Sequence, residues 1–323
     1  MDSLVNVNMD ISPSEKLAEV ISSALGAWIA PWVMKRMAKA KAEGDRITAI
    51  EGAKTEALLV NDYERYVELS TVEKRILSIE QKRQKNIDNV IEVAMHTLDS
   101  EKQISSDPVN PDWATRFFDI AQDISDEQMQ DLWGRILAGE VKQPHSYSLR
   151  TLEALKNISK EEAQLFEKIS QYVLYDQVYY IYHESADKND GKEVKYPEIA
   201  RLVEMGFVQP GSMVTQNYYN HNNEQPMHHL FYDNRYIAFI EMPNGLEQMS
   251  FPIYPLTKVG EELYRLISPE PNIGYFENVL HSILKENKHI SKDIKISYAK
   301  LNWVDFTIGQ FNYDDDTICE IQL

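Results

Sequence analysis

Cysteine is nearly absent from this chain, which has a single one, Cys319, among its 323 residues. An intrachain disulfide is therefore excluded, although a bridge between two chains stays open. A lone cysteine fits the reducing conditions of the cytoplasm. The first residues, MDSLVNVNMDISPSE, also lack the basic stretch of a secretory signal and the arginines of a mitochondrial presequence. We therefore expect a cytoplasmic protein.

Catalytic signatures are missing as well. The sequence has no GxxxxGKS phosphate loop, no GxGxxG dinucleotide fingerprint and no GxSxG nucleophile elbow. The adjacent aspartates at 314–316 fit a turn better than a metal site, because successive side chains of an extended segment point to opposite sides. The sequence predicts no catalytic residue, no metal and no cofactor, and it favours a non-enzymatic protein. An active site without a known motif stays open.

Positive charge is scarce, since 33 lysines and arginines stand against 51 aspartates and glutamates, a net charge of −18. Residues 1–100 contain 13 basic and 16 acidic residues, so the remaining 20 basic and 35 acidic residues leave −15 on the rest of the chain. Nucleic acids are bound mainly through lysine and arginine contacts to phosphate. We therefore do not expect a nucleic-acid partner.

The sequence has no uninterrupted apolar run that is long enough to cross a membrane. The best stretch, residues 17–34, contains Glu19 and Pro31. Its apolar residues follow helical steps and precede a basic cluster, which is typical of a helix lying on an anionic membrane, here the inner face. The alternative is that the same face docks on another helix. The predicted contact residues are Trp28, Ile29, Trp32, Val33, Lys35 and Arg36.

Helix-breaking residues are rare between residues 39 and 98, where proline is absent and the only glycines are Gly44 and Gly52. We expect one long helix or two tandem helices within a first region, residues 1–104. Four apolar residues there follow the alternating three- and four-residue steps of a heptad seam, which ends where charge takes over at residues 80–86. The seam is able to pair within the chain or between chains, so we expect self-association. The seam consists of Leu69, Val72, Ile76 and Ile79.

Residues 112–174 predict four short helices packed as one bundle. Capping pairs mark two of the starts, Ser125 with Gln128 and Ser159 with Glu162. Large apolar residues recur on the inward faces, and we interpret them as core rather than as a binding site. They include Trp113, Phe117, Phe118, Trp133 and Leu137.

The composition changes at residues 175–268, where tyrosine-rich alternation indicates strands. The order of helix, strand, long loop, a hairpin at 236–242 and 249–256, and helix is winged-helix-like. Residues 269–323 predict an α+β cap with a small antiparallel sheet. The expected fold is therefore mainly α, with long N-terminal helices and a helical bundle, followed by a C-terminal α+β part that is winged-helix-like and has a small sheet.

A histidine- and asparagine-rich stretch, NYYNHNNEQPMHH, lies inside the winged-helix-like region. It is too polar for a core, so we interpret it as a loop that contacts a ligand or a partner. No second ligand pair stands at a usual zinc spacing and no cysteine is near, so a metal is not expected. The candidate residues are His221, His228, His229 and Asp233.

The helix near residues 195–204 bears on DNA binding. A recognition helix presents basic and amide side chains to the major groove, whereas this one carries Glu198 and Glu204 against Lys195 and Arg201. Docking of a protein is therefore favoured over reading of DNA. An interaction module or regulator that binds protein or DNA is the alternative function.

Several segments carry a family resemblance, namely EKRILSIEQKRQKNIDNVIEVA, DWATRFFDIAQDISDEQMQDLWGRILAGEV, PHSYSLRTLEALKNISKEEAQLFEKI, IARLVEMGFV and PLTKVGEEL. From about Lys35 to Ile267 the chain resembles a bacterial family described as domain of unknown function 2806. The bundle is also similar to the alpha domain of abortive-infection proteins. The family's own function is undefined and it transfers no catalytic residue. The resemblance implies a bacterial or prophage-borne protein that defends its host against phage.

The function that we expect is a non-enzymatic, oligomeric bacterial protein of abortive-infection-type anti-phage defence, which acts through protein–protein or membrane contact. Its expected partners are further copies of itself and a phage protein or a co-encoded defence protein, with an anionic membrane surface as a further option.

Overall fold

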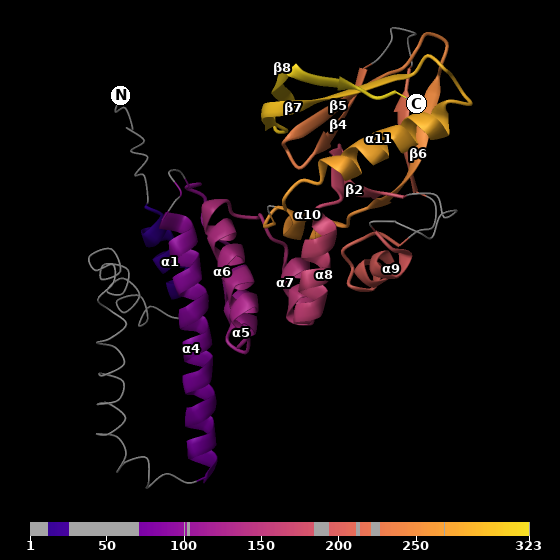
Figure 1. Cartoon of the computed structure of the whole chain (residues 1–323). Coiled ribbons are helices and arrows are strands. Elements are labelled where there is room, and N and C mark those ends of the chain that lie inside the picture. Colours follow the sequence, from indigo (N-terminus) through magenta and orange to yellow (C-terminus); the bar gives the residue numbers. More distant parts are fainter. Residues whose placement is uncertain are drawn as a thin grey trace, which may run out of the picture. The chain divides into compact units, whose positions relative to one another are not determined.

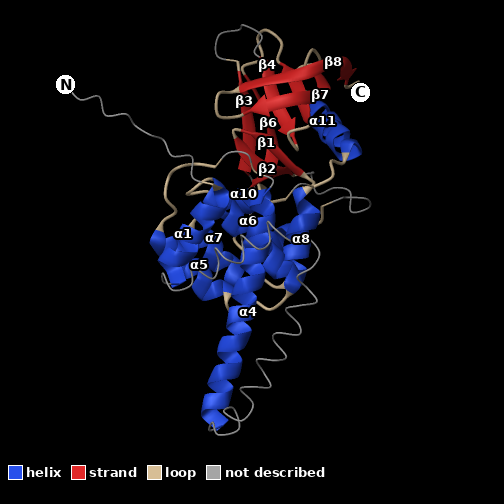
Figure 2. Ribbon diagram, turned by 90° about the vertical axis from the view of Figure 1, so that its left-hand side faces the viewer, coloured by secondary structure: helices blue, strands red, loops and turns tan. Residues whose placement is uncertain are grey.

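The computed structural model describes residues 12–25, 71–99, 101, 104–183, 194–210, 214–220, 227–267 and 269–322 (Figure 1). The chain divides into two compact units, Met1–Lys156 and Asn157–Leu323. In the described ranges the first unit consists of helices, and the second combines helices with a sheet (Figure 2).

The first unit is built around an aromatic core. The ring of Phe117 lies 5.1 Å from that of Trp113 and 5.2 Å from that of Trp133, and both Phe117 and Trp133 are fully buried. The interpretation of these aromatic residues as core is confirmed. The described helices of this unit are α1 (Pro13–Leu25), α4 (Thr71–Asp99), α5 (Pro111–Ala121), α6 (Glu127–Lys142) and α7 (Leu149–Lys156).

Local capping sets where α6 begins. The Asp126 side chain accepts hydrogen bonds from the backbone N–H groups of Gln128 (3.0 Å) and Met129 (3.1 Å). Asp126 is therefore the cap, and the helix starts one residue later than the pairing of Ser125 with Gln128 predicted. Both residues are good caps, so sequence alone does not choose between neighbouring candidates.

A buried carboxylate fixes the connection between α6 and α7. Glu140 is 1% exposed, and its oxygens accept hydrogen bonds from the backbone N–H groups of His145 (2.7 Å) and Tyr147 (3.0 Å). Burial raises the pKa of Glu140, and these hydrogen bonds counter part of the rise. The carboxylate therefore supplies acceptors to two backbone donors of the connection, of which that of Tyr147 is buried.

The second unit contains one antiparallel sheet of eight strands in the order β3-β6-β2-β1-β4-β5-β7-β8, curled into a half-barrel. Helix α11 packs on one face, where Phe276 stacks on Tyr232 at 5.1 Å. The strands are β1 (Val173–Asp176), β2 (Val178–Tyr182), β3 (Val214–Tyr219), β4 (Met227–Tyr232), β5 (Tyr236–Glu241), β6 (Gln248–Pro255), β7 (Lys295–Asp305) and β8 (Gln310–Glu320). The described helices are α8 (Lys160–Ser170), α9 (Tyr196–Glu204), α10 (Lys258–Tyr264) and α11 (Ile273–Asn287).

The expected fold class, mainly α with a winged-helix-like part and a small sheet, is wrong. Strands from the predicted winged-helix-like region and from the predicted cap belong to the same sheet, since β5 pairs with β7 through Ile240 and Ile296. Strands β5 and β6 also do not form the predicted hairpin, because β5 pairs with β4 and β7 while β6 pairs with β2 and β3. Alternation of apolar residues identifies a strand but not the strand that pairs with it. The fold depends on which strands pair.

Among the described ranges, no helix combines the length and the hydropathy that crossing a membrane requires.

Candidate functional site

The outer half of α4, residues 71–85, carries an apolar stripe that faces solvent. Figure 2 shows α4 extending beyond the other described helices of its unit. Val72, Ile76 and Ile79, which we call the α4 seam, are 58%, 52% and 43% exposed. They are the described part of the predicted heptad seam. Three large apolar side chains in a row on a projecting helix make this surface a candidate site for protein contact.

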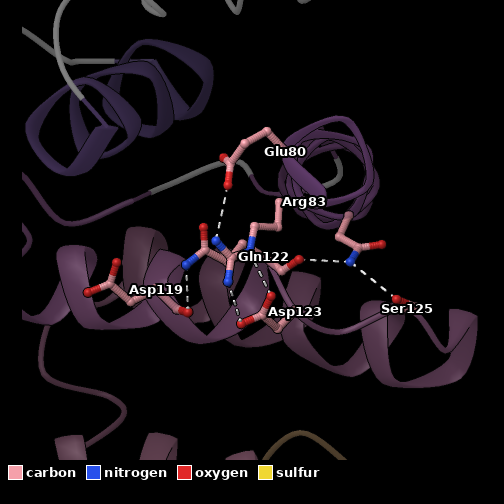
Figure 3. Close-up of polar contacts among 7 residues, drawn as sticks. Glu80, Arg83, Asp119, Gln122, Asp123 and Ser125 are labelled. Carbon is pink, nitrogen blue, oxygen red and sulfur yellow. Dashed lines mark hydrogen bonds and ion pairs between the residues drawn. The ribbon is translucent and has the colours of Figure 1, made fainter. Parts of the chain in front are cut away.

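A polar cluster marks the point where α4 leaves the bundle. Arg83 donates to Asp123 at 2.9 Å and to Glu80 at 3.1 Å (Figure 3). One turn further on, the Asn86 side chain donates to the backbone carbonyl of Gln122 at 2.8 Å. Arg83 and Asn86 continue the heptad spacing of the seam, so the turn between α5 and α6 lies at the end of the seam and on the same face of the helix. The predicted end of the seam at residues 80–86 is thus the exit point.

Beyond the exit point, α4 is basic although the chain is acidic. Residues 71–85 contain five basic residues and two acidic ones, Glu73 and Glu80, which gives +3 in a chain of −18. The five basic residues are Lys74, Arg75, Lys82, Arg83 and Lys85. The outer half therefore combines apolar area with positive charge, which suits an acidic amphipathic partner.

Helix α1 contains the first turns of the predicted amphipathic stripe. Leu17, Val20 and Ile21 are buried, and α1 packs against α5 and α6. Lys16, 3% exposed, donates to the backbone carbonyl of Ser105 at 2.6 Å. These turns of α1 therefore pack against other helices of the same unit. The predicted contact residues Trp28, Ile29, Trp32, Val33, Lys35 and Arg36 lie outside the described residues.

In the second unit, side chains connect strands that are not neighbours in the sheet. Gln216 on β3 donates to Asp176 on β1 at 3.0 Å. The ring of Tyr218, also on β3, stacks on His228 of β4, with centroids 4.4 Å apart and planes 16° apart. Burial raises the pKa of Asp176 and lowers that of His228. The curled sheet therefore encloses polar and aromatic groups from three of its strands.

Of the predicted ligand loop, the structure describes His228, His229 and Asp233. His228 and His229 lie on strand β4, and they point to opposite faces, since His228 stacks on Tyr218 whereas His229 packs against Phe311 at 4.9 Å. His221 lies outside the described residues. Among the residues that the structure describes, no group of three histidine, cysteine, aspartate or glutamate side chains is placed to hold a metal ion.

Asp233 occupies the tight turn between β4 and β5, where it and Asn234 have φ of 51° and 53°. Its carboxylate pairs with Arg235 at 3.0 Å. Burial raises the pKa of Asp233 to about 6, although Arg235 acts in the opposite direction. Asp233 is therefore a turn residue with an altered pKa rather than a partner of the two histidines.

A comparison with known protein families matches the part of the chain that contains most of these features. The sequence profile of a family described as a protein of unknown function, DUF2806, matches residues 70–280. The chain belongs to the DUF2806 family. The match begins one residue before α4 and ends inside α11, so it includes the α4 seam and strands β1 to β6. The resemblance to abortive-infection proteins is not supported by this match. No curated protein and no solved structure matches the chain.

Sequence reasoning missed the polar interior of the DUF2806 sheet. On β3 the residues that face inward are polar or aromatic, and Tyr218 is only 3% exposed. Asn220, directly after β3, is 5% exposed, and its side-chain amide has no hydrogen-bond partner in the described part of the chain. Apolar alternation could not reveal this strand, because its inward positions are Gln216, Tyr218 and Asn220.

Proposed function

We propose that this DUF2806 protein is a non-enzymatic, homo-oligomeric component of bacterial anti-phage defence that acts through protein contacts. The observation that carries the proposal is the α4 seam, whose three side chains are 43–58% exposed on a projecting helix. Its partner outside the oligomer is a phage protein or a co-encoded defence protein. The defence setting rests on the resemblance of the bundle to the abortive-infection alpha domain.

The physical argument starts from the exposed apolar area of the α4 seam. The outer half of α4 continues a helix whose inner half is buried in the bundle, so it presents this area on an anchored helix. Covering exposed apolar area stabilises by about 25 cal/mol per Å². A second chain that covers the seam would therefore stabilise contact between two copies.

The alternative function, a winged-helix-like module that binds protein or DNA, loses its structural basis. Helix α9 is present at Tyr196–Glu204, but the strands around it belong to the eight-stranded sheet. Its acidic residues Glu198 and Glu204 also stand against contact with phosphate. We therefore do not propose this alternative.

The test pairs a seam variant with a control on the opposite side of the same helix. Ile76→Glu places a charge in the seam, and Gln81→Glu places the same charge on the face away from it. Bacteria that express each protein are challenged with a panel of phages, and plaque counts are compared with those of an empty vector. The mass of each purified protein is measured by light scattering.

We expect the wild-type protein and Gln81→Glu to be oligomeric and to lower plaque counts at least tenfold for some phages. Ile76→Glu should be monomeric and unprotective while keeping the helical circular-dichroism signal of the wild type. Protection by a monomeric Ile76→Glu would overturn the link between assembly and defence. No protection by the wild type against any phage of the panel would overturn the defence role.

A further inference from the structure

The α4 seam does not suit pairing with the α4 seam of another copy. Each outer half carries +3, so two of them repel. A parallel arrangement also brings the α5–α6 turns of both copies to the same level, because Asp123 and Gln122 hold that turn on the seam face. The occupant must therefore be acidic, amphipathic and short enough to end at Arg83, where the α5–α6 turn meets the helix.

One segment of the chain meets these requirements. Residues 56–69, EALLVNDYERYVEL, contain four acidic residues and one basic one, which gives −3 against the +3 of the outer half. Their large apolar residues recur at three- and four-residue steps, as on a helix that packs on one side. They are Leu59, Tyr63 and Tyr66, with Val60 and Val67 beside them.

The length fits as well. From Thr71 to Arg83 a helix rises about 18 Å at 1.5 Å per residue. A helical segment of 12 to 14 residues covers that distance, and residues 56–69 number 14. An antiparallel alignment that opposes Tyr63 to Ile76 also opposes Glu56 to Arg83. The charged end of the segment then meets the polar cluster at the exit point.

We propose that residues 56–69 of a neighbouring copy cover the α4 seam, so that two chains exchange these segments. The proposal rests on the homo-oligomer proposed above. In the sequence, Ser70 and Glu73 have the spacing of a capping box, and α4 begins at Thr71. The link between segment and helix is thus only a few residues long, and no glycine or proline occurs from residue 53 to 107. Short connections without turn-forming residues favour exchange between chains.

The test uses disulfide formation in the full chain with Cys319→Ser as background. Tyr63→Cys and Ile76→Cys together should form a disulfide between chains, which runs as a covalent dimer on a non-reducing gel. The control combines Tyr63→Cys with Gln81→Cys, on the opposite side of α4, and should give at least tenfold less dimer. Light scattering on the same samples, before oxidation, reports the mass.

Each outcome separates this inference from the proposed oligomer. An oligomeric mass without the disulfide overturns the exchange and leaves the oligomer standing. A disulfide within one chain at monomeric mass overturns both. Salt gives an independent readout, because contact between opposite charges weakens with salt whereas contact between two +3 helices strengthens. Dissociation should therefore increase several-fold between 0.05 and 0.5 M sodium chloride, and a decrease would contradict the exchange.

Discussion

The position of Asp233 affects both its backbone conformation and the pKa of its carboxyl group. Its φ of 51° lies in the left-handed region, which asparagine and aspartate tolerate better than other residues with a side chain. Its carboxylate is partly desolvated, which raises its pKa to about 6. The folded protein therefore holds this proton more tightly than the unfolded chain does, and stability falls as pH rises from about 4 to 6.

Asp233→Asn should remove this pH dependence. Asparagine keeps the turn conformation and resembles the protonated acid. At pH 7 we expect the variant to be more stable by about 1 kcal/mol, after allowance for solvent screening and for the loss of the pair with Arg235. Urea unfolding at pH 4, 5, 6 and 7 measures the effect. An unchanged slope of stability against pH would contradict the assignment of the raised pKa to Asp233.

Glu140 allows a second prediction at the scale of one residue. Glu140→Ala removes the acceptor for two backbone N–H groups, those of His145 and Tyr147, of which that of Tyr147 is buried. We expect a loss of about 2–4 kcal/mol in the free energy of unfolding of the first unit, since each unsatisfied donor costs about 1–3 kcal/mol. Glu140→Gln, which keeps one acceptor, should fall between alanine and wild type in urea unfolding. Equal stability of all three proteins would refute the capping role.

At the scale of elements, the packing of α4 on α6 depends on Gly134. A Cβ at Gly134 would lie 2.4 Å from the Cβ of Val93, closer than atoms pack. Gly134→Ala should therefore push the two helices apart and destabilise the first unit by about 1–3 kcal/mol, despite the better helix propensity of alanine. Gln128→Ala, on the exposed side of α6, is the control. Thermal unfolding that is unchanged in Gly134→Ala would show that the helices adjust without cost.

Elements with local signals were predictable, and those with distant partners were not. Ser159 caps α8 and reaches Glu162 in the predicted capping box, because the two residues are three apart in the chain. By contrast, β5 pairs with β7 about sixty residues later, and no local pattern specifies such a partner. The same reason explains why the sequence predicted where the seam ends but not the contact that ends it. Arg83 and Asp123 are 40 residues apart, and the sequence showed only that apolar residues give way to charge.

At the scale of the whole chain, the outer half of α4 and the sheet of the second unit offer different kinds of surface. The basic outer half of α4 stands in an otherwise acidic protein, and it carries the exposed seam. The half-barrel sheet offers polar side chains in its interior instead, with Asp176, Tyr218 and His228 gathered from different strands. This difference is the reason for proposing α4 as the element that joins copies of the chain. Of the predicted histidine site, the described His228 and His229 lie on opposite faces of β4.

The central claim is that the outer half of α4 joins copies of the chain. Its most direct test is the mass of the purified full-length protein by light scattering across a range of concentrations. One chain has a mass of 37.4 kDa. We expect at least twice that mass for the wild type and a return to the single-chain mass in Ile76→Glu. A wild-type protein that stays at 37.4 kDa at every concentration would contradict it.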